Sequence, residues 1–268
     1  MKLVRQRYFS VLVSVVLCIA HAFSCMLIKP DGFVMAGRTG LLITGIILLL
    51  SVKHKDYFKK ISLLSLGAFL SSLLIFSLPI GIGYWMGMVT FTFGDNGLSE
   101  TFKKMLPWYG LFFLSASILG TEVIFRGTYS DVINEGSAVK RISGILLQAG
   151  FYILFLLPAL YPYLFASLSQ SGSLFLMREF LAAIAAGFLF GISGHLIISG
   201  LWTFTTGFIN YYLLNDVESG IESAFYYVTS STVFNYLLIG FQIVLVLGLS
   251  IIFFCKMKDI QTSPAQSQ

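Results

Sequence analysis

The sequence predicts an all-α protein that crosses a membrane several times. Of its 268 residues, 57% are hydrophobic and only 11% are charged, whereas a soluble domain carries about a quarter charged residues. The mean hydropathy is +0.87. Several stretches reach the roughly 20 apolar residues that a helix needs to cross a bilayer. They are continuously apolar and do not alternate with polar residues, so the pattern of a transmembrane barrel is excluded.

Eight apolar stretches are expected to form transmembrane helices in one domain over residues 1–258, followed by a short polar cytoplasmic tail at 259–268. The first has the basic start of a signal peptide, but no small-residue cleavage site follows, so we expect it to be retained as a span. The sixth and seventh form one stretch that we expect to fold back at the glycines of "SGHLIISG". The predicted spans cover residues 8–28, 34–52, 61–84, 106–125, 142–166, 179–197, 199–214 and 233–254.

Eight spans place both ends of the chain on the same side of the membrane. The positive-inside rule makes this side cytoplasmic, because it carries most of the 17 lysines and arginines. The same bias explains the pI of about 9.0 without a nucleic-acid partner. The expected environment is the lipid bilayer of a bacterial plasma membrane. The cations on the predicted cytoplasmic side are Lys2, Arg5, Arg7, Lys53, Lys55, Lys59, Lys60, Arg126, Lys140, Arg141, Lys256 and Lys258.

The sequence indicates no metal site and no cofactor. The three cysteines, Cys18, Cys25 and Cys255, lie in or beside apolar stretches and lack the spacing of a zinc site or a disulfide framework. His21 lies in the middle of a span and His54 in a basic loop, and neither has a visible partner for a metal.

The stretch "GTEVIFRG" places two charged residues, Glu122 and Arg126, in the fourth predicted span. Residues four apart on a helix lie on the same face. A charge at the centre of a bilayer costs about 2.5–3.5 kcal/mol on insertion scales, and an ion pair lowers this cost. We expect Glu122 about one turn from the cytoplasmic end of the span, with the segment after it in the cytosol. Two interpretations remain open: a structural ion pair that fixes the helix end, and a carboxylate base or binding group in a cavity open to the cytosol.

"TEVIFRG" resembles the first motif of the CAAX protease and bacteriocin-processing family, also called the CPBP or Abi-domain family. In that family the motif is Glu-Glu-x-x-x-Arg at the end of a transmembrane helix. The resemblance covers about the last 150 residues and implies a helical bundle with a buried hydrophilic cavity. It also implies a mechanism in which the first glutamate and a histidine of the next helix activate water, while a later His-x-x-x-Asn pair stabilises the oxyanion.

Several positions that the family uses for catalysis carry other residues in this sequence. Glu122 and Arg126 match the second glutamate and the arginine, but the first glutamate falls on Thr121, which has no carboxylate. The positions of the second-motif histidine, the third-motif histidine and the asparagine are occupied, in that order, by Ala159, Phe208 and Tyr212. The resemblance therefore implies a degenerate member without peptidase activity, that is, a pseudoprotease.

His195 is a second candidate catalytic residue, because the predicted topology puts it at roughly the depth of Glu122. A Glu–His pair across two helices could bind a metal or activate water, whereas the alternative is a polar residue at a helix end. The stretch "GISG" (Gly191–Gly194) matches the Gly-x-Ser-Gly pattern of rhomboid proteases. No histidine follows His195 to activate that serine, so we assign the glycines to helix packing.

The sequence thus predicts a non-catalytic scaffold or regulator that binds another membrane or cell-envelope protein, with Glu122 and Arg126 holding the bundle together. The first alternative is an active intramembrane endopeptidase of the CAAX-processing or bacteriocin-immunity type that uses Glu122. The second is a transporter or permease subunit. Few charges lie in the spans and no ATP-binding motif is present, which disfavours that second alternative.

Overall fold

The computed structural model describes residues 2–27, 33–51, 61–89, 110–134, 137–166, 170–209 and 232–262, and every regular element in these residues is a helix. The all-α class that the sequence predicts is therefore confirmed. The helices are α1 (Lys2–Leu27), α2 (Phe33–Ser51), α3 (Leu63–Trp85), the π-helix η3 (Ala116–Gly127), α5 (Ser130–Asn134), α6 (Ala138–Ala166), α7 (Gln170–Ser193), α8 (Leu196–Phe208) and α9 (Thr232–Thr262).

Six of the described helices are long and apolar enough to cross a membrane, which identifies the chain as a helical membrane protein. Eight spans are not supported, because two further apolar stretches, Gly37–Leu50 and Leu196–Gly207, are shorter within the residues that the structure describes. The six candidate spans are Tyr8–Leu27, Leu63–Trp85, Gly110–Gly127, Ala138–Pro158, Ser173–Ser193 and Val233–Met257.

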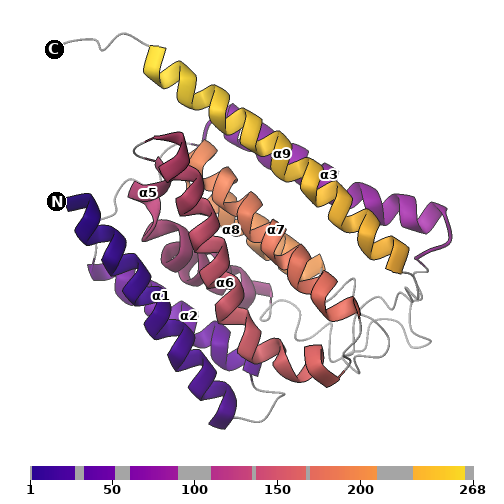
Figure 1. Ribbon diagram of the computed structural model, residues 1–268, viewed down its shortest axis with the longest axis horizontal. Coiled ribbons are helices and arrows are strands. Elements are labelled where there is room, and N and C mark those ends of the chain that lie inside the picture. Colours follow the sequence, from indigo (N-terminus) through magenta and orange to yellow (C-terminus); the bar gives the residue numbers. More distant parts are fainter. Residues whose placement is uncertain are drawn as a thin grey trace.

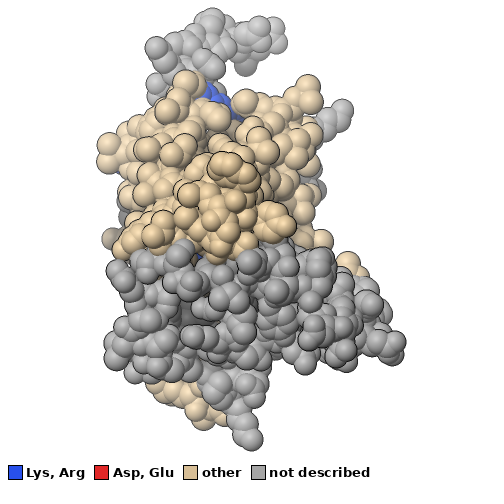
Figure 2. Space-filling view, turned by 90° about the vertical axis from the view of Figure 1, so that its right-hand side faces the viewer, with Lys and Arg blue, Asp and Glu red and all other residues tan. Residues whose placement is uncertain are grey.

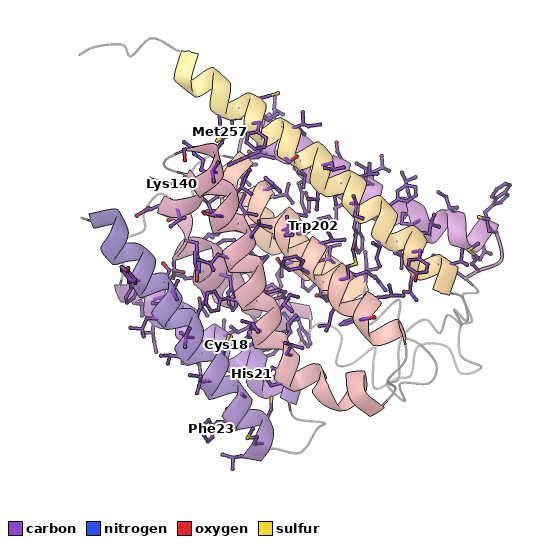
Figure 3. The ribbon with its side chains drawn as sticks, in the orientation of Figure 1. Cys18, His21, Phe23, Lys140, Trp202 and Met257 are labelled. Carbon is purple, nitrogen blue, oxygen red and sulfur yellow. The ribbon has the colours of Figure 1, made fainter. Side chains whose placement is uncertain are left out.

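Neighbouring helices along the chain run in opposite directions through the bundle (Figure 1). As a result, α1 begins and α9 ends at the same end of the molecule, at the upper left of Figure 1. Lys140, at the start of α6, also lies at this end (Figure 3). The helix α7 is central and contacts α6, α8 and α9. The assignment of the shared end to the cytoplasm stays a prediction from the charge count.

The structure locates the end of the third predicted span and the turn between the sixth and seventh. The helix α3 continues through Pro79 and ends at Trp85. The chain folds back between α7 and α8 at Gly194, whose φ of +72° is left-handed and favours glycine, so the predicted reversal is confirmed. The indole of Trp202 in α8 then donates a hydrogen bond to the carbonyl of Ala182 in α7 at 3.0 Å, which ties the two helices together.

The helices α2 and η3 pack with their backbones in contact. A Cβ atom at Gly45 would lie 1.7 Å from the carbonyl oxygen of Leu119, and one at Gly120 would lie 2.9 Å from the carbonyl carbon of Leu41. Only glycine fits at such a crossing. This close approach holds η3, which carries the charged pair, inside the bundle between α2 and α8.

The outward faces of α1, α3 and α9 are apolar. Only 33% of the spanning window of α3 and of α9 is buried, compared with 72% for α7. Figure 2 shows one side of the molecule, on which the described residues expose almost no charged side chain. A soluble protein rarely exposes so large an apolar surface, so we assign these faces to lipid.

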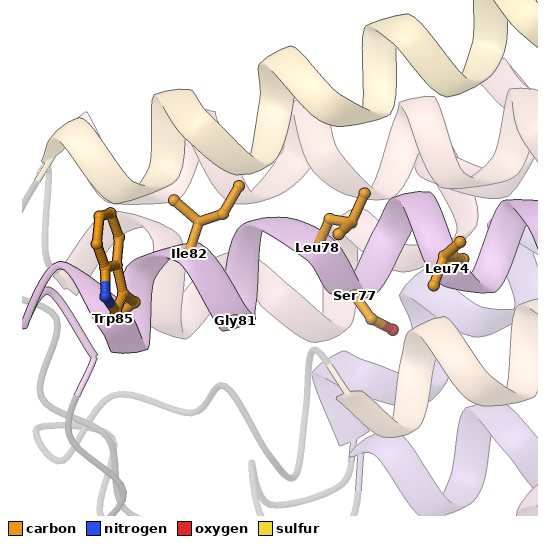
Figure 4. A pocket seen from close by; sticks show the side chains of 6 residues that line it. All are labelled: Leu74, Ser77, Leu78, Gly81, Ile82 and Trp85. Carbon is orange, nitrogen blue, oxygen red and sulfur yellow. The ribbon is translucent and has the colours of Figure 1, made fainter.

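A shallow groove runs along the exposed side of α3 (Figure 4). Its lining is almost entirely apolar, and neither Glu122 nor Arg126 contributes to it. It therefore lacks the convergent polar groups that fix the orientation of a ligand and belongs to the lipid-facing surface. The lining residues are Leu74, Ser77, Leu78, Gly81, Ile82 and Trp85.

Candidate functional site

Glu122 and Arg126 are in direct contact at the centre of the bundle. The distance from Arg126 Nη1 to Glu122 Oε1 is 3.2 Å, and neither side chain has any exposed area. Both lie in η3, whose backbone hydrogen bonds skip one residue more than in an α-helix, as in the bond from Thr128 N to Val123 O at 3.1 Å. An isolated buried charge is very costly, so each group satisfies the other.

The helix α8 supplies the second contact of the Glu122 carboxylate. The Thr203 hydroxyl donates a hydrogen bond to Glu122 Oε1 at 2.7 Å, and the Ser199 hydroxyl, one turn earlier, also lies beside the carboxyl group. Gly200 permits this approach, since a Cβ there would lie 3.2 Å from Glu122 Cγ. Oε2 of Glu122 has no hydrogen-bond partner among the described residues.

Arg126 connects η3 to α6 and α7. Its Nη2 donates a hydrogen bond to the carbonyl of Ala183 at 3.3 Å, and the same carbonyl accepts a bond from Gln148 Nε2 at 3.0 Å. The guanidinium carbon lies 5.5 Å from the ring centroid of Tyr152, a cation–π distance. Together with the Thr203 bond, these contacts make the ion pair a junction of η3, α6, α7 and α8.

The structure does not bring His195 next to Glu122. His195 is the N-terminal cap residue of α8, whereas Glu122 lies beside Ser199 and Thr203, about 6 and 12 Å further along that helix. The charged residue that acts on Glu122 is Arg126. A general base and its imidazole partner need a separation of about 2.6–3.2 Å. In the part of the chain that the structure describes, no three histidine, cysteine or acidic residues are placed to hold a metal.

Three of the four positions at which the sequence departs from the CAAX-protease motifs fall on described helices, each on a different one. Thr121 is fully buried beside Glu122 in η3, and its hydroxyl has no hydrogen-bond partner among the described residues. Ala159 lies in α6 and Phe208 is the last residue of α8. Tyr212 lies outside the described residues.

The chain does not leave the bundle directly after Arg126. Tyr129 and Ile133 have no exposed area, and the Tyr129 hydroxyl lies 3.1 Å from the hydroxyl of Ser14 in α1. Burial raises the pKa of Tyr129 to about 12, so this hydroxyl stays protonated. The segment therefore packs into the bundle between two candidate spans, and its position on the cytosolic side stays a prediction. The apolar side chains of Tyr129, Val132 and Ile133 recur at a helical spacing, and α5 buries them against α6 and α7.

Sequence reasoning missed the residues that surround the pair. Thr203, Gln148 and Tyr152 come from two other helices, and nothing in their spacing connects them with Glu122. A weaker signal was present, because Gln148 is an isolated amide in an apolar helix and Ser199 and Thr203 are polar and four residues apart in another. Polar side chains inside membrane helices usually face the interior of the bundle, so such residues are candidates for the environment of a buried charge.

A comparison with protein-family models gives no match, and comparisons with curated proteins and with solved structures give none either. The resemblance to the CAAX protease and bacteriocin-processing family is therefore carried by the short motif around Glu122 and Arg126 alone. Functional conclusions for this chain rest on its own residues and their geometry.

Proposed function

We propose that this protein is a non-catalytic membrane scaffold or regulator, a degenerate relative of the CAAX-type membrane proteases, in which the Glu122–Arg126 pair holds the helices together. The observation that carries the proposal is the environment of the pair. Both side chains are fully buried, and each reaches a different neighbouring helix, through Thr203 in α8 and the Ala183 carbonyl in α7. Contacts of this kind position helices relative to one another.

The partners of Glu122 are unsuited to peptide hydrolysis. Its charged neighbour is an arginine, which stays protonated at all physiological pH values and cannot exchange a proton during catalysis. Thr203 is a hydrogen-bond donor with no acid–base capacity near neutral pH. The position that carries the water-activating glutamate in the family is occupied by Thr121. These features favour a structural role for the carboxylate.

A scaffold of this kind would act through its surface. A partner inside the membrane would have to replace lipid on part of the outward apolar faces of α1, α3 and α9. We propose another membrane or cell-envelope protein as the partner, in the plasma membrane, with both ends of the chain in the cytoplasm. The support for this orientation is the excess of lysine and arginine on one side in the predicted eight-span topology.

A double-mutant cycle tests the structural role. Arg126→Gln leaves a buried carboxylate without its counter-charge, and Glu122→Gln leaves a buried guanidinium, so each should lower stability by about 3–5 kcal/mol. The double variant carries no unpaired charge and should regain most of this loss. The measurements are thermal unfolding in lipid nanodiscs and abundance in membranes. A double variant no more stable than the singles would contradict the proposed structural pair.

Catalysis is tested separately by identifying the peptide termini that proteolysis produces in cells. The neutral double variant, brought to the abundance of the wild type, should crosslink to the same membrane proteins in intact cells as the wild type does. A proteome-wide comparison of peptide termini between the two should show no cleavage that depends on Glu122. Cleavage products that disappear in a fully folded Glu122→Gln variant would contradict the scaffold proposal.

The same comparison addresses the one competing function that a specific observation favours. Oε2 of Glu122 has no hydrogen-bond partner among the described residues, which is the state of a carboxylate that could accept a proton from water. An active endopeptidase therefore predicts termini that require Glu122 but not Thr203. The scaffold predicts that Thr203→Val and Glu122→Gln differ only in stability.

A further inference from the structure

A second pair of reactive side chains lies on α1, outside the Glu122 cluster. His21 and Cys25 are one helical turn apart, with 3.7 Å between Nε2 of the imidazole and Sγ of the thiol. Their exposed fractions are only 6% and 9%. Figure 3 shows His21 on the side of α1 that faces the bundle and Phe23 on the opposite side. The pair is thus enclosed by protein.

The imidazole is held in one orientation by two neighbouring helices. The ring of Phe155 in α6 stacks on it with a centroid distance of 4.3 Å and an interplanar angle of 16°. On α2, a Cβ atom at Gly37 would lie 2.4 Å from Cε1 of His21, so glycine makes room for the ring. A ligand whose rotamer is fixed by packing is preorganised for binding.

The two donor atoms are hydrogen-bonded to each other and lie close to the separation that a single bound ion needs. Bonds from a metal to a thiolate and to an imidazole measure about 2.3 and 2.0 Å, which together exceed the 3.7 Å separation observed here. Two-coordinate Cu(I) and Ag(I) prefer their two ligands on opposite sides of the ion, which at these bond lengths places the donor atoms about 4.3 Å apart. Binding therefore requires the Cys25 side chain to rotate and its Sγ to move about 0.6 Å away from Nε2.

The donor set and the surroundings select the class of ion. Thiolate is a soft ligand that favours Cu(I) among the biological metals, and imidazole is compatible with it. Zinc usually takes four ligands, whereas the described residues offer no cluster of three. A monovalent cation with one thiolate and one neutral imidazole also has no net charge, which removes most of the cost of burying an ion in a membrane helix.

We infer that His21 and Cys25 form a two-ligand site for a soft monovalent cation, with Cu(I) as the biological ion and Ag(I) as its redox-inert equivalent. Binding replaces the proton of the Cys25 thiol, so one proton is released for each ion bound and no electron is transferred. The site provides an ion-binding activity that the proposed scaffold role does not require. The proposed ion site does not depend on the role of the Glu122–Arg126 pair, so each can be tested without the other.

The other two cysteines provide matched controls. Cys18 is half-buried on the same face of α1, but its Sγ is 3.7 Å from the carbonyl of Phe151. Cys255 lies exposed on α9. Replacing both by serine gives a background protein whose only thiol is Cys25, and any thiolate-dependent ion must then bind there.

The experiment titrates Cu(I), without oxygen, into the purified background protein in nanodiscs against a coloured Cu(I) chelator. We expect one equivalent to be withdrawn from the chelator. The added substitutions Cys25→Ser and His21→Phe should each weaken binding by more than about 100-fold, since groups outside the first ligand shell alone contribute about 10- to 100-fold. His21→Phe preserves the ring that stacks on Phe155, and thermal unfolding verifies that each variant is folded.

X-ray absorption at the copper edge of the background protein gives a readout that does not depend on the variants. One sulfur and one nitrogen neighbour are expected. Failure to withdraw copper, a Cys25→Ser protein that binds as tightly as the background, or a folded His21→Phe protein with unchanged affinity would overturn the inference. A spectrum with two sulfur neighbours, which would indicate an ion shared between two chains, would overturn it as well.

Discussion

The inner and outer helices of this bundle differ in both polarity and burial. The spanning windows of η3 and α7 are 61% and 72% buried, and they contain the buried charged residues Glu122, Arg126, Arg178 and Glu179. The window of α3 is 33% buried and has no charged residue. In a soluble protein the most buried helices are the most apolar. Here the order is reversed, because the surrounding lipid is apolar and polar groups find partners only inside the protein.

This reversal explains why the charged pair occupies the interior. On α3 a glutamate would face lipid, with only its own helix to supply a partner. In η3 it meets a hydroxyl of α8, while its arginine meets a carbonyl of α7. Four pairs of substitutions test whether the burial of a side chain, rather than its residue type, determines its contribution to stability. Their expected effects decrease from the first pair to the last.

Removing one inner charge should have the largest effect. Arg126→Met leaves Glu122 buried without a counter-ion and should lower stability by about 3–5 kcal/mol. Lys140→Met removes a cation of similar length at an exposed position of α6 and should change stability by less than about 0.5 kcal/mol. Thermal unfolding of both variants in nanodiscs checks this prediction. Equal losses of stability in the two variants would show that the buried position of Arg126 does not increase the effect of removing its charge.

The glycine contact between α2 and η3 comes next. Gly45→Ala places a methyl group on the carbonyl oxygen of Leu119 and should cost about 3 kcal/mol, the upper end of the usual range for overpacking. The control on the same helix is Gly40→Ala, since a Cβ atom at Gly40 has no neighbour within 4 Å. Membrane abundance and melting temperature should fall for the first variant only. If Gly40→Ala were equally harmful, helix propensity rather than the close approach would be responsible.

Removing the Thr203 hydroxyl, which contacts Glu122, should lower stability by a smaller amount. Thr203→Val keeps the shape of the side chain but removes a hydrogen bond to a charged group, which typically contributes about 1.5–3 kcal/mol. The matched substitution Ser77→Ala removes a hydroxyl that bonds only to its own helix, at the Leu73 carbonyl of α3, and should be nearly neutral. Denaturant-induced unfolding of the two variants measures the difference. A neutral Thr203→Val would mean that Arg126 alone satisfies the carboxylate.

The smallest effect is expected on the lipid-facing groove. Leu74 is 64% exposed on α3, so Leu74→Ala exchanges contacts with lipid and leaves no cavity, and stability should change by less than about 0.5 kcal/mol. Leu189→Ala in α7 truncates a side chain with no exposed area and should cost about 2–5 kcal/mol. Comparison of their melting temperatures provides the check. A strong effect of Leu74→Ala would show that a protein neighbour covers the groove.

Long apolar stretches made the helical class and the approximate positions of the helices predictable from the sequence. The expected number of eight spans is not supported, because only six helices in the described residues are long and apolar enough to cross a membrane. Nothing in the sequence indicated that η3 would be a π-helix. Apolar spacing reports which residues share a face but does not report the register of backbone hydrogen bonds.

The contact between Glu122 and Arg126 follows from their spacing on one helix, whereas the groups around it come from elsewhere in the chain. Ala183 contributes only a backbone carbonyl, which every residue has, so no sequence pattern can single it out. The pairing of His21 with Cys25 was missed for another reason. Their spacing was visible, but their burial and the stacking of Phe155 on the imidazole depend on how α1, α2 and α6 pack.

The long-range contacts of η3 have a consequence for how a ribosome delivers this protein to the membrane. Thr203 follows Glu122 by 81 residues, so at about 5–20 residues per second the nascent chain waits roughly 4–16 s for that hydroxyl. During this interval the carboxylate has its ion pair with Arg126 on the same helix but not yet the hydroxyl of Thr203. The mutual neutralisation of Glu122 and Arg126 therefore first lowers the cost of inserting this helix into the lipid. Only later does the pair position helices in the folded bundle.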